Sequence, residues 1–127
     1  MDTTLFYRQN MIDHAKNPRN FGIIKDSDYK TVVINRHCGD EISLYLKISK
    51  NKIENIQFAG SGCAVAISSA SMLTEYLNGK NVDLLKKLKR EDVLKNFGVS
   101  LTPSREKCAL LVFEGVKKLD EELISNN

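Results

Sequence analysis

The chain has 127 residues, a net charge of +3 and no tryptophan, with 42% hydrophobic and 28% charged residues. Such a length and composition are typical of one ordinary globular domain that buries about two-thirds of its unfolded surface, so no metal is needed merely for folding. We therefore expect a single domain over residues 1–127, without repeats or disordered segments, and interpret any bound metal as functional.

The sequence predicts neither a targeting signal nor a membrane segment. The chain begins Met-Asp-Thr-Thr, with no basic leader beside an apolar run, which indicates a cytoplasmic protein rather than a secreted one. The longest uncharged stretch, residues 58–74, contains four serines and falls short of the ~18 apolar residues that span a bilayer. The basic segment 80–95 has no interleaved aromatic residues, which is typical of a solvated helix face and argues against nucleic-acid binding.

The first half of the chain predicts one helix followed by three strands. Residues 3–16 form a short amphipathic helix that ends before Pro18 and Gly22, with helical spacing at Leu5, Phe6, Gln9, Ile12 and Asp13. The pattern then changes to a period of two over segments 31–35, 41–49 and 52–59. These segments predict three consecutive antiparallel strands, in which one face of the second strand carries Ile42, Leu44, Leu46 and Ile48.

The second half predicts helices. Ser61 is the expected N-cap of a helix from Ala64 to Leu77, which Asn78 and Gly79 end. Two short helical pieces follow at 82–88 and 91–96, and a long helix begins with Thr102 as N-cap and Pro103 in its first turn. Its apolar stripe is Cys108, Leu111, Val112, Val116, Leu119 and Leu123. The order of elements predicts an α+β fold, a three-stranded antiparallel sheet with helices packed against it.

Three cysteines lie far apart in the sequence, and an odd number of thiols in a reducing compartment is better explained by metal binding, catalysis or burial than by structural disulfides. Cys38, with Gly39 and Asp40, falls in the connection between the first two strands, which is open to approach. Cys63 is at a helix N-terminus, where unpaired amides favour a thiolate. Cys108 is on an apolar stripe, and simple burial explains it best on pattern alone.

Three thiolates and the Asp40 carboxylate form a ligand set that tetrahedral Zn²⁺ accepts, and thiolates also bind iron with sulfide. Zinc with these ligands would carry a formal charge of about minus two, which a base such as Lys107 or Arg105 would offset. The two histidines are interpreted as surface or packing residues. Because the spacing lacks paired cysteines, a metal-free binding module with packed cysteines stays an alternative.

Four segments together resemble the U-type iron-sulfur assembly proteins, the IscU/SufU/NifU N-terminal domain family, over about residues 7–119. The segments are NPRNFG, CGDEISLYLKI, FAGSGCAVAISSASMLTEYLNGK and REKCALLVFEGV. The resemblance implies an α+β fold and a metal site of Cys38, Asp40, Cys63 and Cys108. It also implies a SufS/IscS-like cysteine desulfurase as partner, which passes persulfide sulfur to one of these thiols, and apo iron-sulfur proteins or carriers downstream.

The family has two branches, a scaffold that assembles a [2Fe-2S] cluster and a zinc-dependent sulfurtransferase. Lys107 is like the sulfurtransferase branch, whereas the insertion that this branch carries ahead of its last helix is missing. Scaffolds of the family carry a short sequence block that a dedicated chaperone recognises, and the segment LTPSR stands in its place here. We favour a zinc-bound sulfur acceptor, whose activity as an enzyme would be at most that of a zinc-dependent sulfurtransferase acting with a cysteine desulfurase. Cys38 is the first choice of persulfide acceptor and Cys108 is the second. The alternatives are a [2Fe-2S] or iron-binding scaffold and the metal-free module.

Overall fold

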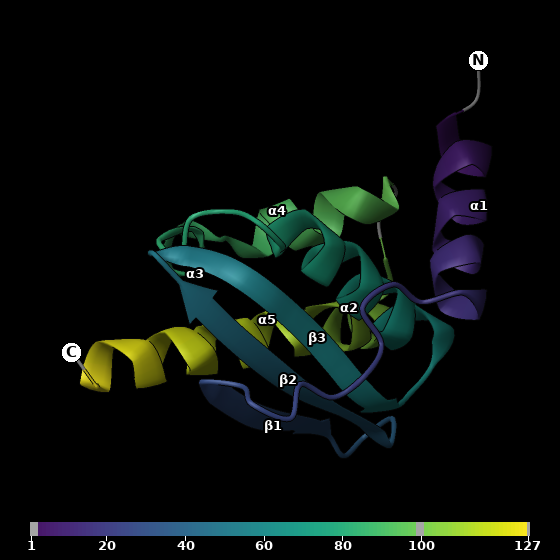
Figure 1. Ribbon diagram of the computed structural model, residues 1–127. Coiled ribbons are helices and arrows are strands. Elements are labelled where there is room, and N and C mark those ends of the chain that lie inside the picture. Colours follow the sequence, from purple (N-terminus) through teal and green to yellow (C-terminus); the bar gives the residue numbers. More distant parts are fainter. Residues whose placement is uncertain (1–2, 99–100, 127) are drawn as a thin grey trace.

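The computed structural model describes residues 3–98 and 101–126, and side chains from Leu5 onward (Figure 1). Its order of elements is that of the predicted α+β fold. In chain order the elements are α1 (Thr3–Lys16), β1 (Tyr29–Asn35), β2 (Asp40–Ser49), β3 (Lys52–Ser61), α2 (Ala64–Leu77), α3 (Leu84–Lys87), α4 (Arg90–Leu94), the short 3₁₀ helix η1 (Lys95–Phe97) and α5 (Pro103–Ser125).

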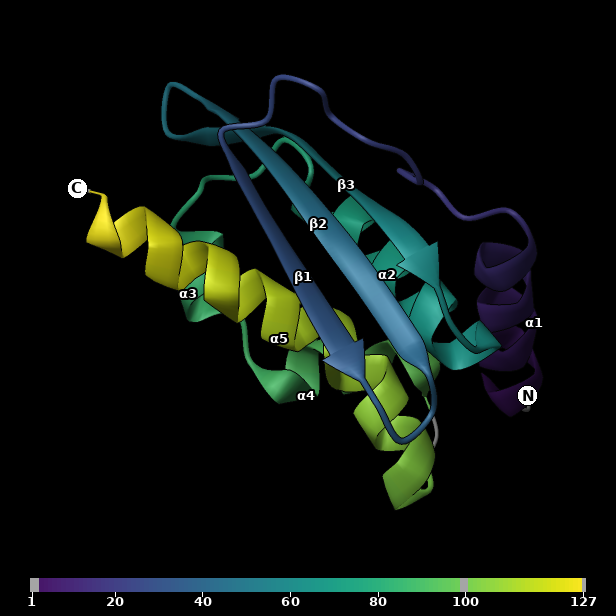
Figure 2. The same cartoon turned by 90° about the horizontal axis from the view of Figure 1, so that it is seen from below.

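The three strands form one antiparallel sheet in the order β1-β2-β3, so β2 is central. Ile42, Leu44 and Leu46 are completely buried on the face of β2 that the helices cover, as the period-two pattern predicts. Ile48 is only half-buried, and the register of β2 against β3 shifts between Lys47 and Ile48. Helix α5 packs on β1 and β2 while α2 packs on β3, and both lie behind the sheet in Figure 2.

Helix α2 has the predicted bounds, but its N-cap is a different residue from the predicted one. Ser61 is the last residue of β3, where it pairs with Glu41, so it cannot cap the helix and the predicted N-cap is wrong. Cys63 is the N-cap residue instead, with an extended backbone and no capping bond from its side chain. The cysteine therefore stands at the first open amides of α2.

Helix α5 starts as predicted, because the Thr102 hydroxyl accepts a hydrogen bond of 3.3 Å from the Arg105 N–H and Pro103 occupies the first turn. Its apolar stripe faces the sheet; five of its six residues are buried and Leu123 is half-buried. Over residues 3–98 and 101–126, none of the helices combines the length with the apolar composition that crossing a membrane requires.

Helix α1 is present, but its amphipathic interpretation is wrong. Leu5 and Phe6 are 55% and 66% exposed, while the side that faces inward carries the buried His14 together with Met11, which packs against the core. His14 is buried, with its Nδ1 2.7 Å from the Ser71 hydroxyl of α2, and the Arg19 N–H donates to the same hydroxyl at 2.8 Å. The Ser71 hydroxyl of α2 therefore holds both the end of α1 and the segment that follows it.

Close packing at Gly115 of α5 generates a prediction about stability. A Cβ atom at this position would lie 2.6 Å from Leu44 Cδ1 and 3.4 Å from Val33 Cγ2. Gly115→Val should overpack the core and lower the free energy of unfolding by about 1–3 kcal/mol in urea titrations. Glu114→Ala, at the exposed neighbouring position, should change it by less than about 0.5 kcal/mol. Equal effects of the two substitutions would show that α5 does not approach β2 as closely as described.

The burial of His14 predicts a pH dependence of stability. Burial lowers the pKa of His14 below 6.5, nearby Arg19 lowers it further, and the charges of Glu75 and Asp13 oppose the shift. Because the pKa of His14 is lower in the folded state than in the unfolded state, protonation of His14 favours unfolding. The free energy of unfolding is therefore fully retained above pH 6.5 and decreases as the pH falls below it. Unfolding titrations from neutral to mildly acidic pH should show a smaller loss for His14→Gln than for the parent. An equal loss in the two proteins would show that His14 does not cause this pH dependence.

Candidate metal centre

The turn between β1 and β2 presents the first thiol. Residues 36–39 form this turn, and Gly39 has a φ of +74°, in the left-handed region that favours glycine. The Gly39 N–H donates to the Asn35 carbonyl oxygen at 2.9 Å and closes the turn. Cys38, one residue before the glycine, is exposed to solvent.

Asp40, the first residue of β2, turns its side chain inward and is completely buried. Its Oδ1 accepts a hydrogen bond of 2.9 Å from the Cys63 N–H at the start of α2. Gly62 leaves the space for this contact, because a Cβ there would lie 2.9 Å from Asp40 Oδ1. No basic side chain of the described residues lies within ion-pair distance of the carboxylate.

Cys108 reaches the same point from α5. It is 3% exposed, and its S–H donates to Cys38 Sγ at 3.4 Å. Cys63 Sγ lies 4.0 Å from Asp40 Oδ2. The ligand atoms of Cys38, Asp40 and Cys108 all lie within 4.8 Å of one another. The structure thus brings Cys38, Asp40 and Cys108 closely together, while Cys63, the fourth nominated residue, lies outside this group of three and contacts it through Asp40.

The donor chemistry of this cluster fits a metal ion with a preference for sulfur. Tetrahedral zinc with Zn–S bonds of ~2.3 Å places two sulfurs about 3.8 Å apart, close to the separation of Cys38 and Cys108. A fully buried carboxylate without a basic partner is costly unless it binds a cation. Burial, followed by the hydrogen bonds with Cys38, Cys63 and Asp40, raises the pKa of Cys108, so this thiol needs a nearby positive charge to ionise.

A cavity of about 480 Å³ opens beside the three cysteines. The predicted base Arg105 is among its lining residues, while Lys107 is exposed and is not one of them. Helix α1 contributes a second base, Arg8, with Tyr7 and Met11. The positive charge beside the thiols therefore comes from two helices that are distant in sequence.

Sequence reasoning missed two neighbours of the cluster. The Asn35 amide, at the end of β1, lies 3.9 Å from Cys108 Sγ, and its place after an alternating strand gave no sign of this contact. The position of Arg8 beside the cysteines could not be predicted, because it depends on how α1 packs against the rest of the fold. His37 is exposed in the turn and His14 is buried between α1 and α2, in accord with their interpretation as surface and packing residues.

Comparisons with known proteins match this fold and these cysteine segments. The iron-sulfur cluster assembly scaffold protein IscU 1 of Archaeoglobus fulgidus is 37% identical over 112 residues, which cover 88% of this chain and 72% of the relative. The zinc-dependent sulfurtransferase SufU of Bacillus subtilis is 33% identical over 132 aligned positions, covering 88% of this chain and 87% of the relative. Because that alignment is longer than the part of this chain that it covers, the relative carries residues that this chain lacks.

A crystal structure from Fervidobacterium islandicum AW-1, described as an iron-sulfur cluster assembly scaffold protein of the SUF system, has the same fold. Its TM-score is 0.74 at 22% identity, covering 93% of this chain and 98% of the other. The protein-family model described as NifU-like N terminal domain matches residues 6–119 of this chain. These matches confirm the resemblance that the four sequence segments indicate, and the chain belongs to the NifU-like N-terminal domain family.

Proposed function

We propose that this protein acts in iron-sulfur cluster assembly as a zinc-bound acceptor of persulfide sulfur from a cysteine desulfurase. The family, and the assembly proteins named among its relatives, support the general role. The observation that carries the specific role is the exposed Cys38 thiol, which lies at the edge of a buried cluster with Asp40 and Cys108. Such a cluster can fix the position of the reactive thiol, while Cys38, its exposed member, stays accessible to a partner protein.

Four side chains would hold zinc, namely Cys38, Asp40, Cys63 and Cys108. Bound zinc would supply a deprotonated and redox-silent thiolate at neutral pH. The protein contributes the fixed positions of its buried members, since Asp40 is anchored by the Cys63 N–H and Cys108 belongs to a long helix. Arg8 and Arg105 line the adjacent cavity and would offset the negative charge of the ligand set.

Cys38 is the better acceptor on access, because it is exposed in a turn while Cys108 is 3% exposed. In the transfer, the Cys38 thiolate attacks the terminal sulfur of the desulfurase persulfide. A new S–S bond forms on Cys38 as the old one breaks, and the electron pair leaves on the desulfurase thiolate. That thiolate takes up the proton which Cys38 has lost, so the exchange needs no outside oxidant or reductant.

The partners follow from this chemistry. The donor would be a SufS/IscS-like desulfurase, which carries the persulfide that the Cys38 thiolate can attack, and the receivers would be apo iron-sulfur proteins or their carriers. The exposed turn at residues 36–39 would present Cys38 to the desulfurase.

A second candidate function is a scaffold on which a [2Fe-2S] cluster is built and then handed on. The identity of 37% to a protein named as an assembly scaffold favours it, as do the residues of the SufU relative that are missing here. The cluster would be cargo on the same thiols. A metal-free module of packed cysteines is poorly supported, because Cys38 and Cys63 are both exposed.

Desulfurase stimulation tests the proposal. Cys38→Ala should reduce the stimulation of a SufS-like desulfurase to the rate of the desulfurase alone, because the open acceptor is lost. The parent, after incubation with desulfurase and cysteine, should gain the mass of sulfur on the peptide that contains Cys38. His37→Ala, a substitution in the same exposed turn, should keep both properties.

Full stimulation by Cys38→Ala would make the acceptor assignment wrong. A protein that instead gains a visible chromophore with iron, cysteine and desulfurase, and passes it to an apo-ferredoxin, is the scaffold. A protein that stays colourless and keeps its zinc under those conditions is the sulfur acceptor.

A further inference from the structure

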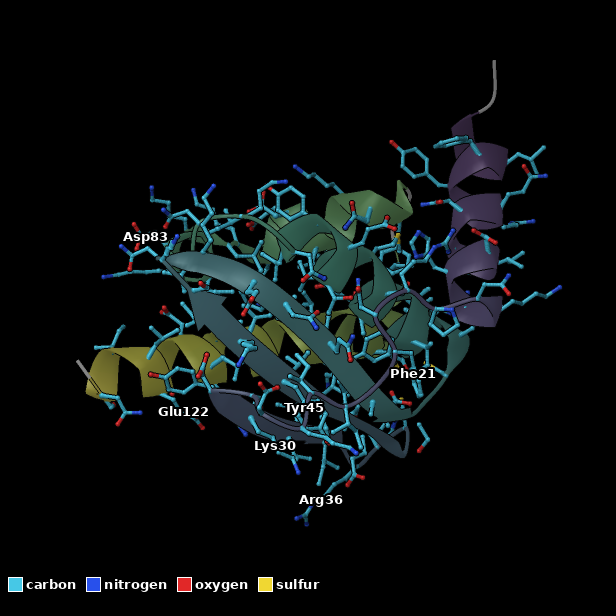
Figure 3. The ribbon with its side chains drawn as sticks, in the orientation of Figure 1. Phe21, Lys30, Arg36, Tyr45, Asp83 and Glu122 are labelled. Atoms are coloured by element: carbon cyan, nitrogen blue, oxygen red, sulfur yellow. The ribbon has the colours of Figure 1, made fainter. Side chains whose placement is uncertain are left out.

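A groove of about 670 Å³ lies far along the sheet from the cysteines. The start of β1, the end of β2, α3 and the last turn of α5 line it. Figure 3 labels Asp83 of this groove near the end of the molecule that carries the C-terminal part of α5, away from Arg36 of the β1–β2 turn. None of the residues nominated for sulfur chemistry lines the groove.

The groove is acidic although the whole chain is basic. Asp28, Asp83 and Asp120 line it against a single base, Lys86, in a chain with 19 basic and 16 acidic residues. Within the described ranges, none of the three carboxylates has a basic side chain at ion-pair distance. The C-terminal end of the 23-residue helix α5 adds its negative partial charge. The groove therefore attracts positive charge.

The same groove also offers apolar surface. Ile124, on the last turn of α5, is 55% exposed. Ile48, Val82 and Leu123 are half-buried beside it. An occupant that only carried charge would leave this surface in water, so the lining fits a cation with an apolar part.

The spacing of the carboxylates argues against a metal ion as the occupant. In the part of the chain that the structure describes, the group Cys38, Asp40 and Cys108 is the one that brings three ligand atoms within 4.8 Å of one another. The three aspartates of the groove are thus too far apart to hold one ion together. They can instead meet several positive charges along an extended occupant.

We propose that this groove docks a basic segment of a partner protein, with an apolar side chain against Ile124 and lysine or arginine side chains beside Asp83 and Asp120. The inference is independent of the sulfur chemistry. Eight strand residues at ~3.3 Å each separate Asp40 from Ile48, a distance of about 26 Å. A partner segment in the groove therefore leaves Cys38 free for a second protein, so the chain can hold a sulfur donor and another partner at once.

The test uses short labelled peptides and the full chain. A peptide of leucines and lysines should bind at low ionic strength in a fluorescence anisotropy titration and shift the amide NMR signals of groove residues. Asp83→Asn with Asp120→Asn should weaken this binding about tenfold, since two exposed charge pairs are lost. Glu54→Gln with Glu91→Gln removes two exposed acids outside the groove and should keep the affinity.

Further probes separate the possible occupants. Ile124→Ser should weaken the leucine-lysine peptide but not a lysine-serine peptide, and the bound peptide should leave the alkylation rate of Cys38 unchanged. Equal binding of both peptides to the parent would show that the apolar surface plays no part and would overturn the proposal. Spermine that displaces the peptide and binds more tightly would identify a polyamine instead. NMR shifts confined to other surfaces, or an unchanged affinity in the double aspartate variant, would also make it wrong.

Discussion

The candidate site depends on one buried carboxylate. Asp40 enters the interior at the first residue of β2, and its bond to the Cys63 N–H ties the β1–β2 turn to the start of α2. A buried carboxylate is costly unless hydrogen bonds or a cation satisfy its oxygens. The thiols of Cys38 and Cys108 lie where a cation would compensate that cost. The same side chain thus both assembles the site and creates its need for a positive ion.

The fold separates two electrostatic environments along one sheet. The cysteine cluster lies where β1 and β2 are joined and is bordered by Arg8 and Arg105, while the acidic groove lies beyond the other end of β2. Helices α2 and α5 keep both ends of the sheet in place by covering a single face (Figure 2). A scaffold with an exposed turn at one end can present the Cys38 thiol without opening the core.

The sequence allowed those parts of the fold to be predicted that local patterns determine. The alternation of apolar and polar residues predicted the positions of the strands. Asn78 and Gly98 are the C-cap residues of helical segments, where such residues are common. The inward side of α1 could not be predicted, because it depends on the hydrogen bond between His14 and Ser71 of α2. Convergence of the three cysteines was equally hidden, since each lies on a different element and no paired spacing marks them. The residue types nominated the four ligands, and recognition of the family segments, rather than spacing, made this metal site the favoured hypothesis.

The central claim is that Cys38, Asp40, Cys63 and Cys108 hold one metal ion. Metal analysis with X-ray absorption spectroscopy at the zinc edge, on the purified full chain and on Asp40→Ala, tests it most directly. The account predicts about one zinc per chain with three sulfur ligands and one oxygen ligand, and a changed oxygen shell in the variant. A parent chain without stoichiometric metal, or with a shell of nitrogen and oxygen alone, would contradict it.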